Sequence, residues 1–135
     1  PHAGEFEGLA GHPRGEDGVA ATRDLAAATG AVVLLKGSTT VVAEPDGGVL
    51  LVRAGDARLA TAGTGDVLTG VVAALIASGA DPWRGAAAAA HLHGRAALLG
   101  PAGGLVAWEV VVLVPAAGER LLDGPGAHSG PPPHP

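Results

Sequence analysis

A glycine-rich turn in the middle of the chain is followed directly by an apolar helical pattern. Residues 61–70 read Thr-Ala-Gly-Thr-Gly-Asp-Val-Leu-Thr-Gly. From Val67 onward, apolar residues recur at the spacing of one helix face, and Gly79 is expected to end the helix. At such a helix N-terminus, unpaired N–H groups and the helix dipole favour a negative charge. The turn is therefore able to hold a phosphate or a developing oxyanion.

Asp66 places a carboxylate in the first turn of this predicted helix. A carboxylate repels a bound phosphate, so its presence beside an anion site makes sense if it has a separate task. Taking a proton from an attacking hydroxyl is such a task. Aspartate is also favoured in the first turn of ordinary helices. For the short motif by itself the ordinary helix start is the stronger alternative, and the rest of the chain must decide.

Length and charge limit the classes of protein to which the chain can belong. Its 135 residues correspond to about one domain, and a net charge of −5 gives no basic footprint for nucleic acid. The absence of cysteine excludes disulfides and thiolate metal sites, and no apolar run reaches the ~18 residues that span a membrane. The chain begins with proline and shows no signal peptide. We expect a cytoplasmic fragment that lacks its upstream part.

The first half of the chain has the rhythm of a layered α/β domain. Residues 19–29 predict a helix that Gly30 ends, and residues 31–35 predict a strand that is apolar on both faces. Residues 40–44 and 49–52 predict a β-hairpin around the turn at 45–48. Ligands in open α/β sheets lie beyond the carboxyl ends of strands. The loop at 36–40, with its lysine and three hydroxyls, could therefore cradle a phosphate, and an ordinary polar turn is the alternative.

The two ends of the chain give weaker signals. Residues 1–11 predict a loop and a short helix with Phe6 and Leu9 facing a core, and His2 taken by itself is most simply a surface histidine. Residues 83–99 predict a helix packed between neighbours. Its His91 and His93 diverge at i, i+2 spacing, so we expect no metal site there.

The last segments differ from one another in composition. Residues 105–114 are ambiguous, because residues 110–114 have the β-branched composition of a buried strand, and residues 115–122 predict a short helix. Residues 123–135 are rich in proline and glycine and have nothing to bury, so we expect a disordered tail.

Three blocks, in order, resemble the ADP/ATP-dependent NAD(P)H-hydrate dehydratases of the ribokinase-like superfamily. They are Pro1-His2-Ala3-Gly4-Glu5-Phe6, Val33-Leu34-Leu35-Lys36-Gly37-Ser38-Thr39-Thr40 and the long block at 59–70. The third block is specific to this family, whereas the first two would be weak by themselves. The resemblance covers about residues 1–122. It implies a three-layer α/β sheet with helices on both faces, of which this chain would be the C-terminal part.

The resemblance also implies an activity, the repair of nicotinamide coenzymes hydrated on the reduced ring. A phosphoryl group passes from ADP or ATP to the added hydroxyl, and phosphate then leaves, giving AMP and phosphate when ADP is the donor. Mg²⁺ would neutralise the donor phosphates, without dedicated metal ligands from the protein. The resemblance further implies a homo-oligomer and, upstream, the missing half of the domain and an epimerase domain.

The same resemblance assigns roles to individual residues. Asp66 would be the base and would contact the hydrated coenzyme together with His2. The amides of Gly63, Thr64 and Gly65 would form the anion hole. The nucleotide would be bound by Lys36, Gly37, Ser38, Thr39, Thr40 and Gly65.

The chain departs from the family pattern in three places. Gly55-Asp56-Ala57-Arg58 replaces a usual Gly-Asn-Pro-Gly, and Trp108-Glu109 replaces a Ser-Asp helix start. By resemblance residues 105–114 are therefore helical, against their composition. The family domain is also roughly twice as long, with the missing half before Pro1. We expect the isolated chain to be aggregated or only marginally folded, because a strand buried on both faces needs neighbours on both edges.

Two other functions remain open on the sequence. A vitamin-precursor kinase of the same superfamily would use the same aspartate and anion hole but would release a stable phosphoester. A non-enzymatic fragment would bind adenine nucleotide without turnover. Analysis of the products separates the two enzymes. The coding sequence upstream of Pro1 would show whether the chain is part of a normal enzyme or a non-enzymatic fragment.

Overall fold

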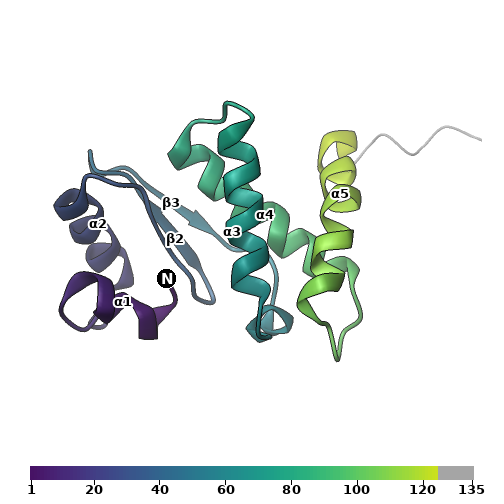
Figure 1. Cartoon of the computed structure of the whole chain (residues 1–135), viewed down its shortest axis with the longest axis horizontal. Coiled ribbons are helices and arrows are strands. Elements are labelled where there is room, and N and C mark those ends of the chain that lie inside the picture. Colours follow the sequence, from purple (N-terminus) through teal and green to yellow (C-terminus); the bar gives the residue numbers. More distant parts are fainter. Residues whose placement is uncertain (125–135) are drawn as a thin grey trace, which may run out of the picture.

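The computed structural model describes residues 1–124 as an α/β arrangement with one small sheet (Figure 1). Helices flank the sheet on both sides, in agreement with the three layers expected from the sequence. The elements in chain order are α1 (Ala3–Ala10), α2 (Gly18–Thr29), β1 (Val33–Leu35), β2 (Thr40–Ala43), β3 (Val49–Val52), η1 (Ala57–Ala60), α3 (Thr64–Ala77), α4 (Pro82–Leu99) and α5 (Ala107–Asp123).

The sheet has three antiparallel strands in the order β1-β2-β3. The predicted hairpin is β2 and β3, in which Thr40 lies opposite Val52 and Ala43 opposite Val49. The predicted strand at 31–35 is confirmed as β1, which pairs with β2 through Leu34 opposite Val42. Because side chains alternate along a strand, β1 contributes to both faces of the sheet, as the apolar run predicted.

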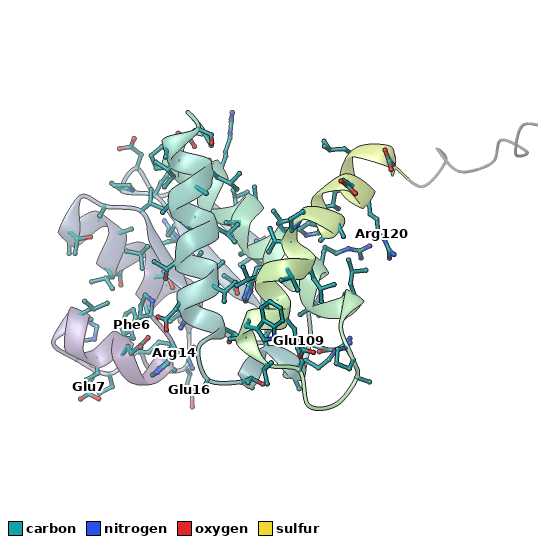
Figure 2. All side chains as sticks on the ribbon, turned by 45° about the vertical axis from the view of Figure 1, so that its right-hand side comes forward. Phe6, Glu7, Arg14, Glu16, Glu109 and Arg120 are labelled. Atoms are coloured by element: carbon teal, nitrogen blue, oxygen red, sulfur yellow. The ribbon has the colours of Figure 1, made fainter. Side chains whose placement is uncertain are left out.

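One face of the sheet is covered by α1 and α2. Phe6, with no exposed surface, packs there with Leu25, Val33 and Leu35 in one hydrophobic cluster. Asp17 accepts hydrogen bonds from the first amides of α2, and Gly30 ends that helix in a left-handed conformation at φ 67°. Figure 2 shows Phe6 on the inner side of α1 and Glu7 on its outer side.

The other face is covered by α3 and α4. Leu34 and Val52 of the sheet pack there against Leu68, Ala89 and Ala90. The small residues of α4 allow close approach, as its alanine-rich composition predicted. A Cβ added at Gly94 would collide with the carbonyl of Ala54. The chain before η1 therefore lies directly on α4, which fixes the start of the segment that leads to α3.

The structure corrects two predictions. The β-branched segment at 105–114 is not a strand but belongs to α5, as the family resemblance implied, and Pro115 lies inside this helix. Glu109 accepts a hydrogen bond from the Val106 amide at 2.9 Å, which stabilises the helix start. Leu9 is not a core residue, because 63% of it is exposed. Residues three apart share a helix face, but Phe6 is the buried residue of α1, so the packed part of this short helix does not extend to Leu9.

The predicted tail, residues 123–135, lies outside the described residues except for its first two positions. Asp123 ends α5, so the helix extends one residue beyond the predicted boundary. Within residues 1–124, no helix is long and apolar enough to cross a bilayer.

Candidate functional site

One cavity of about 940 Å³ brings together five separate segments of the chain. The start of α1, the loop between β1 and β2, the segment around η1, the N-terminus of α3 and one face of α4 form its wall. The predicted residues in this wall are His2, Lys36, Gly37, Ser38, Thr40, Gly63, Thr64, Gly65 and Asp66. Thr39, also predicted, is absent from the wall.

The glycine-rich turn that was predicted to bind an anion, residues 61–65, leads into the N-terminus of α3 and is called the anion turn below. Gly63 adopts φ 85°, a left-handed conformation that favours glycine, and no side chain caps the helix. The amide of Thr64 donates to the Thr61 carbonyl over 3.3 Å, and the amide of Asp66 donates to the Gly63 carbonyl over 3.1 Å. Within residues 1–124, the amide of Gly65 has no hydrogen-bond partner. The amide of Gly63 likewise has no partner among the described residues, so two of the three amides predicted for the anion hole are available to a ligand.

Lys36 brings a positive charge to the same place. Its backbone follows β1 and donates to the Pro1 carbonyl over 2.8 Å. A Cβ added at Gly65 would lie 2.7 Å from the Lys36 Nζ, so the ammonium group lies against the first turn of α3. The ammonium also lies 4.0 Å from a carboxylate oxygen of Glu5. An ammonium ion and a helix N-terminus thus converge on one point, where both favour a bound anion.

His2 is held in place by a reciprocal cap at the start of α1. Its Nδ1 accepts hydrogen bonds from the amides of Gly4 and Glu5 at 3.0 and 3.1 Å. Glu5 in return accepts a hydrogen bond from the His2 amide at 2.8 Å. This bond is the main cause that lowers the pKa of Glu5, and the charges of His2 and Lys36 add to it. The cap directs the His2 Nε2 toward the carboxylate of Glu5, whose Oε1 lies 3.5 Å away. Both residues belong to the cavity wall.

Asp66 is exposed and lies in the cavity wall one residue after Gly65. No ion pair or side-chain hydrogen bond involves its carboxylate among residues 1–124. It therefore keeps both oxygens available for a ligand. Asp66 thus lies in the first turn of α3 beside the uncapped N-terminus, without a capping hydrogen bond of its own.

The sequence analysis assigned no site role to four polar residues of the cavity wall, Glu5, Asp56, Thr61 and His93. His93 lies on α4 with 5% of its surface exposed, and its Nε2 is buried without a hydrogen-bond partner. Its neighbour His91 is exposed on the same helix, so the two rings diverge as predicted. Burial lowers the pKa of His93, and the Lys36 charge lowers it further, while hydrogen bonding to the Thr64 backbone opposes both.

The lowered pKa of His93 predicts a pH-dependent stability. Between the folded pKa and the ordinary value of 6.5, the unfolded chain binds more protons than the folded one. The free energy of unfolding should therefore be highest above pH 6.5 and should fall as the pH drops below it. His93→Gln should remove this part of the pH dependence, and His91→Gln should leave it unchanged. Urea unfolding at a series of pH values measures the free energy of unfolding. Equal pH profiles for wild type and His93→Gln would show that His93 does not cause this pH dependence.

Residues 1–124 hold no group of three or more His, Cys, Asp or Glu side chains that could bind a metal ion. The cavity wall instead offers separate carboxylates, those of Glu5, Asp56 and Asp66.

Comparison with known proteins gives matches over most of the chain. The family model described as NAD(P)H-hydrate dehydratase matches residues 1–108. A curated relative from Mycobacterium tuberculosis, named bifunctional NAD(P)H-hydrate repair enzyme Nnr, is 61% identical over 79 residues, or 58% of this chain and 17% of the relative. The chain thus spans a minor part of the curated relative's length.

Two solved structures show the same fold. The ADP/ATP-dependent NAD(P)H-hydrate dehydratase of Bacillus subtilis, co-crystallised with ATP/Mg²⁺, is 35% identical with a TM-score of 0.83. The match covers 89% of this chain and 46% of that chain. A ribokinase-like superfamily protein from Enterococcus faecalis is 24% identical with a TM-score of 0.70, over 88% of this chain and 43% of that one. The expected ribokinase-like α/β fold is therefore confirmed.

Proposed function

Because the chain belongs to the NAD(P)H-hydrate dehydratase family, we propose that its cavity carries out the phosphoryl transfer of an ADP- or ATP-dependent hydrate dehydratase. The substrate is a nicotinamide coenzyme hydrated on its reduced ring. The products are the restored coenzyme, phosphate and, when ADP is the donor, AMP. The observation that carries the proposal is the convergence of Lys36, the N-terminus of α3 and the unpaired carboxylate of Asp66 in one cavity.

In this mechanism Asp66 accepts the proton of the added hydroxyl. The hydroxyl oxygen attacks the terminal phosphorus of the nucleotide, and the bond from that phosphorus to the bridging oxygen breaks. Charge on the transferring group is stabilised by the Gly65 amide, the dipole of α3 and the Lys36 ammonium, all fixed before the ligand arrives. The phosphate ester then loses phosphate as its C–O bond breaks. Loss of a proton from the neighbouring ring carbon restores the double bond.

Magnesium suits this cavity as a companion of the nucleotide. Mg²⁺ keeps several waters and binds through one or two carboxylates together with substrate phosphates. Because residues 1–124 hold no cluster of side chains that would form a protein cage, the ion would be held mainly by the donor phosphates and water. When bound, the ion supplies neutralisation of charge on the donor phosphates.

The other residues of the wall divide between the two ligands in this proposal. Ser38 and Thr40, beside Lys36, would donate hydroxyl hydrogen bonds to the nucleotide, with Gly37 and Thr39 completing the loop. His2, fixed by its cap, would contact the hydrated coenzyme. Homo-oligomer formation also belongs to the proposal, as do the second half of the domain and an epimerase domain. The size and bifunctional name of the M. tuberculosis relative support the last two.

Product analysis tests the proposed function. The complete polypeptide that the gene encodes is incubated with hydrated NADH, ADP or ATP, and Mg²⁺. We expect reduced coenzyme and free phosphate in equal amounts. A stable phosphorylated product would instead identify a small-molecule kinase, and nucleotide binding without any turnover would identify a binding module.

Lys36→Ala should weaken ADP binding more than binding of the coenzyme. A hydrogen bond to a charged group contributes about 1.5–3 kcal/mol, which corresponds to roughly 10- to 100-fold in affinity. Isothermal titration calorimetry with each ligand measures the difference. Arg23→Ala removes the same charge from α2, outside the cavity wall, and serves as the control. Unchanged ADP affinity in Lys36→Ala would make the loop after β1 an ordinary polar turn.

A further inference from the structure

Asp56 is a carboxylate in a wall where an anion is expected to bind. It lines the main cavity and also a smaller one of about 450 Å³ between η1 and the loop before α5. A negative charge at this place, added to that of Asp66, opposes the approach of a phosphorylated ligand. Unlike Asp66, Asp56 has no evident role in the proposed chemistry. The structure must therefore compensate its charge, or the site is weakened.

Arg58 provides this compensation through a two-pronged contact. Its Nε lies 2.9 and 3.0 Å from the two carboxylate oxygens of Asp56, and its Nη2 lies 2.7 Å from Oδ2. The third nitrogen, Nη1, donates to the Gly100 carbonyl at the end of α4 over 3.0 Å. Contact with Arg58 lowers the pKa of Asp56 to about 2. The carboxylate is thus ionised and its charge is balanced within one planar fork.

The pair also lies at the base of the anion turn. Asp56 accepts a hydrogen bond from the Arg58 amide at 3.0 Å and so begins η1. Thr61 Oγ1 donates to the Arg58 carbonyl over 3.0 Å. Thr64 Oγ1 donates to the carbonyls of Leu59 and Thr61 over 2.7 and 2.8 Å. Hydrogen bonds therefore run without interruption from the ion pair to the first residue of α3.

We propose that Arg58 is a positioning and charge-masking residue: it balances the negative charge of Asp56 in the cavity wall, and the site binds a phosphorylated ligand weakly when this charge is left unbalanced. The inference rests on the proposed function only for the identity of the ligand. Asp56 and Arg58 do not touch the reacting atoms. They set the electrostatic potential of the wall and hold the turn that presents the Gly65 amide.

Four variants of the complete polypeptide separate masking from a purely structural role: Arg58→Ala, Asp56→Asn, the double variant and Arg53→Ala. ADP and inorganic pyrophosphate are the probes, with affinity measured by calorimetry at low and high salt. Arg58→Ala leaves an unbalanced carboxylate and should weaken both anions by roughly tenfold at low salt. Asp56→Asn keeps the oxygen that caps η1 and leaves the positive charge of Arg58 unbalanced. Anions should therefore bind as well as in wild type or more tightly.

The double variant is the decisive comparison, because removing both charges restores neutrality. It should recover most of the affinity that Arg58→Ala loses, and the loss in Arg58→Ala should shrink at high salt. Arg53→Ala removes the same charge from an exposed residue outside the cavity wall and should bind as wild type does. If Arg58→Ala does not fold, Arg58→Gln and Arg58→Lys carry the same test, with the lysine variant closer to wild type.

Each outcome decides the inference. Wild-type affinity in Arg58→Ala, or a double variant as weak as Arg58→Ala, would overturn it even if the protein dehydrates its substrate. The expected order of affinities in a protein that restores no coenzyme would support the inference and contradict the proposed reaction. A wild-type protein that binds neither ADP nor pyrophosphate would overturn both.

Discussion

Replacing Asp66 by asparagine is expected to lower turnover by about 10²–10⁴-fold, the usual contribution of a positioned base. Asparagine has nearly the same shape but cannot accept the hydroxyl proton. Nucleotide binding and the fold should be retained, because no hydrogen bond or ion pair of the Asp66 carboxylate holds α3 among the described residues. Steady-state kinetics with hydrated NADH and ADP measure the effect in the complete polypeptide.

Asp24→Asn provides the matched control for this change. Asp24 is exposed on α2 and lies outside the cavity wall, so the same loss of charge should leave turnover unchanged. Calorimetry with ADP establishes that the Asp66 variant still binds nucleotide. Near-normal turnover in Asp66→Asn would end the assignment of this residue as the base.

Phe6→Ala is expected to have the largest effect on stability. Phe6 is the single phenylalanine of the chain and has no exposed surface. Its loss should cost about 3–5 kcal/mol, as is usual for a fully buried aromatic residue. Because domains are stable by only ~5–15 kcal/mol, the variant should be close to unfolding. The packing of Phe6 also holds α1, which presents His2 and Glu5 to the cavity.

Leu9→Ala on the same helix is the control. Leu9 is 63% exposed, so its truncation should change the free energy of unfolding by no more than about 0.5 kcal/mol. Urea unfolding of both variants measures the difference. Equal losses in the two variants would mean that α1 packs differently from this structure.

Local signals in the sequence predicted the elements that position the anion turn. Gly30 ends α2, the hairpin forms where its turn residues indicated, and Asp66 lies in the first turn of α3. These features depend on residues close together in the chain, so periodicity and turn chemistry are sufficient to find them. The gathering of the β1–β2 loop, α1 and α3 around one cavity came from the family resemblance and not from spacing.

Predictions failed where packing between distant segments decides the structure. The β-branched residues at 110–114 favour a strand by composition, yet α5 forms because its inner residues, such as Val110 and Ala117, pack against Ala96 and Ala97 of α4. Leu9 and Phe6 have the same hydrophobic character, and only the three-dimensional position of α1 shows that one is buried and the other exposed.

The polar residues that the sequence analysis missed share a physical reason. His93 belongs to the cavity wall because α4 brings it beside Thr64 and Lys36. Both residues are far away in the sequence, so no local pattern shows this. In the sequence, Arg58 was noted only as part of the segment 55–58, which departs from the family pattern. Its contact with the Gly100 carbonyl, which joins η1 to the end of α4, could not be foreseen from spacing.

The path of the hydroxyl oxygen tests the central claim most directly. Hydrated NADH prepared with a heavy-oxygen label in the added hydroxyl is converted by the complete polypeptide with unlabelled ADP and Mg²⁺, and the released phosphate is analysed by mass spectrometry. If the hydroxyl oxygen attacks phosphorus and its bond to the ring then breaks, each phosphate released carries one labelled oxygen. Unlabelled phosphate, with the label found in water, would show that no phosphoryl group reaches the hydroxyl and would contradict the roles proposed for Asp66 and the anion turn.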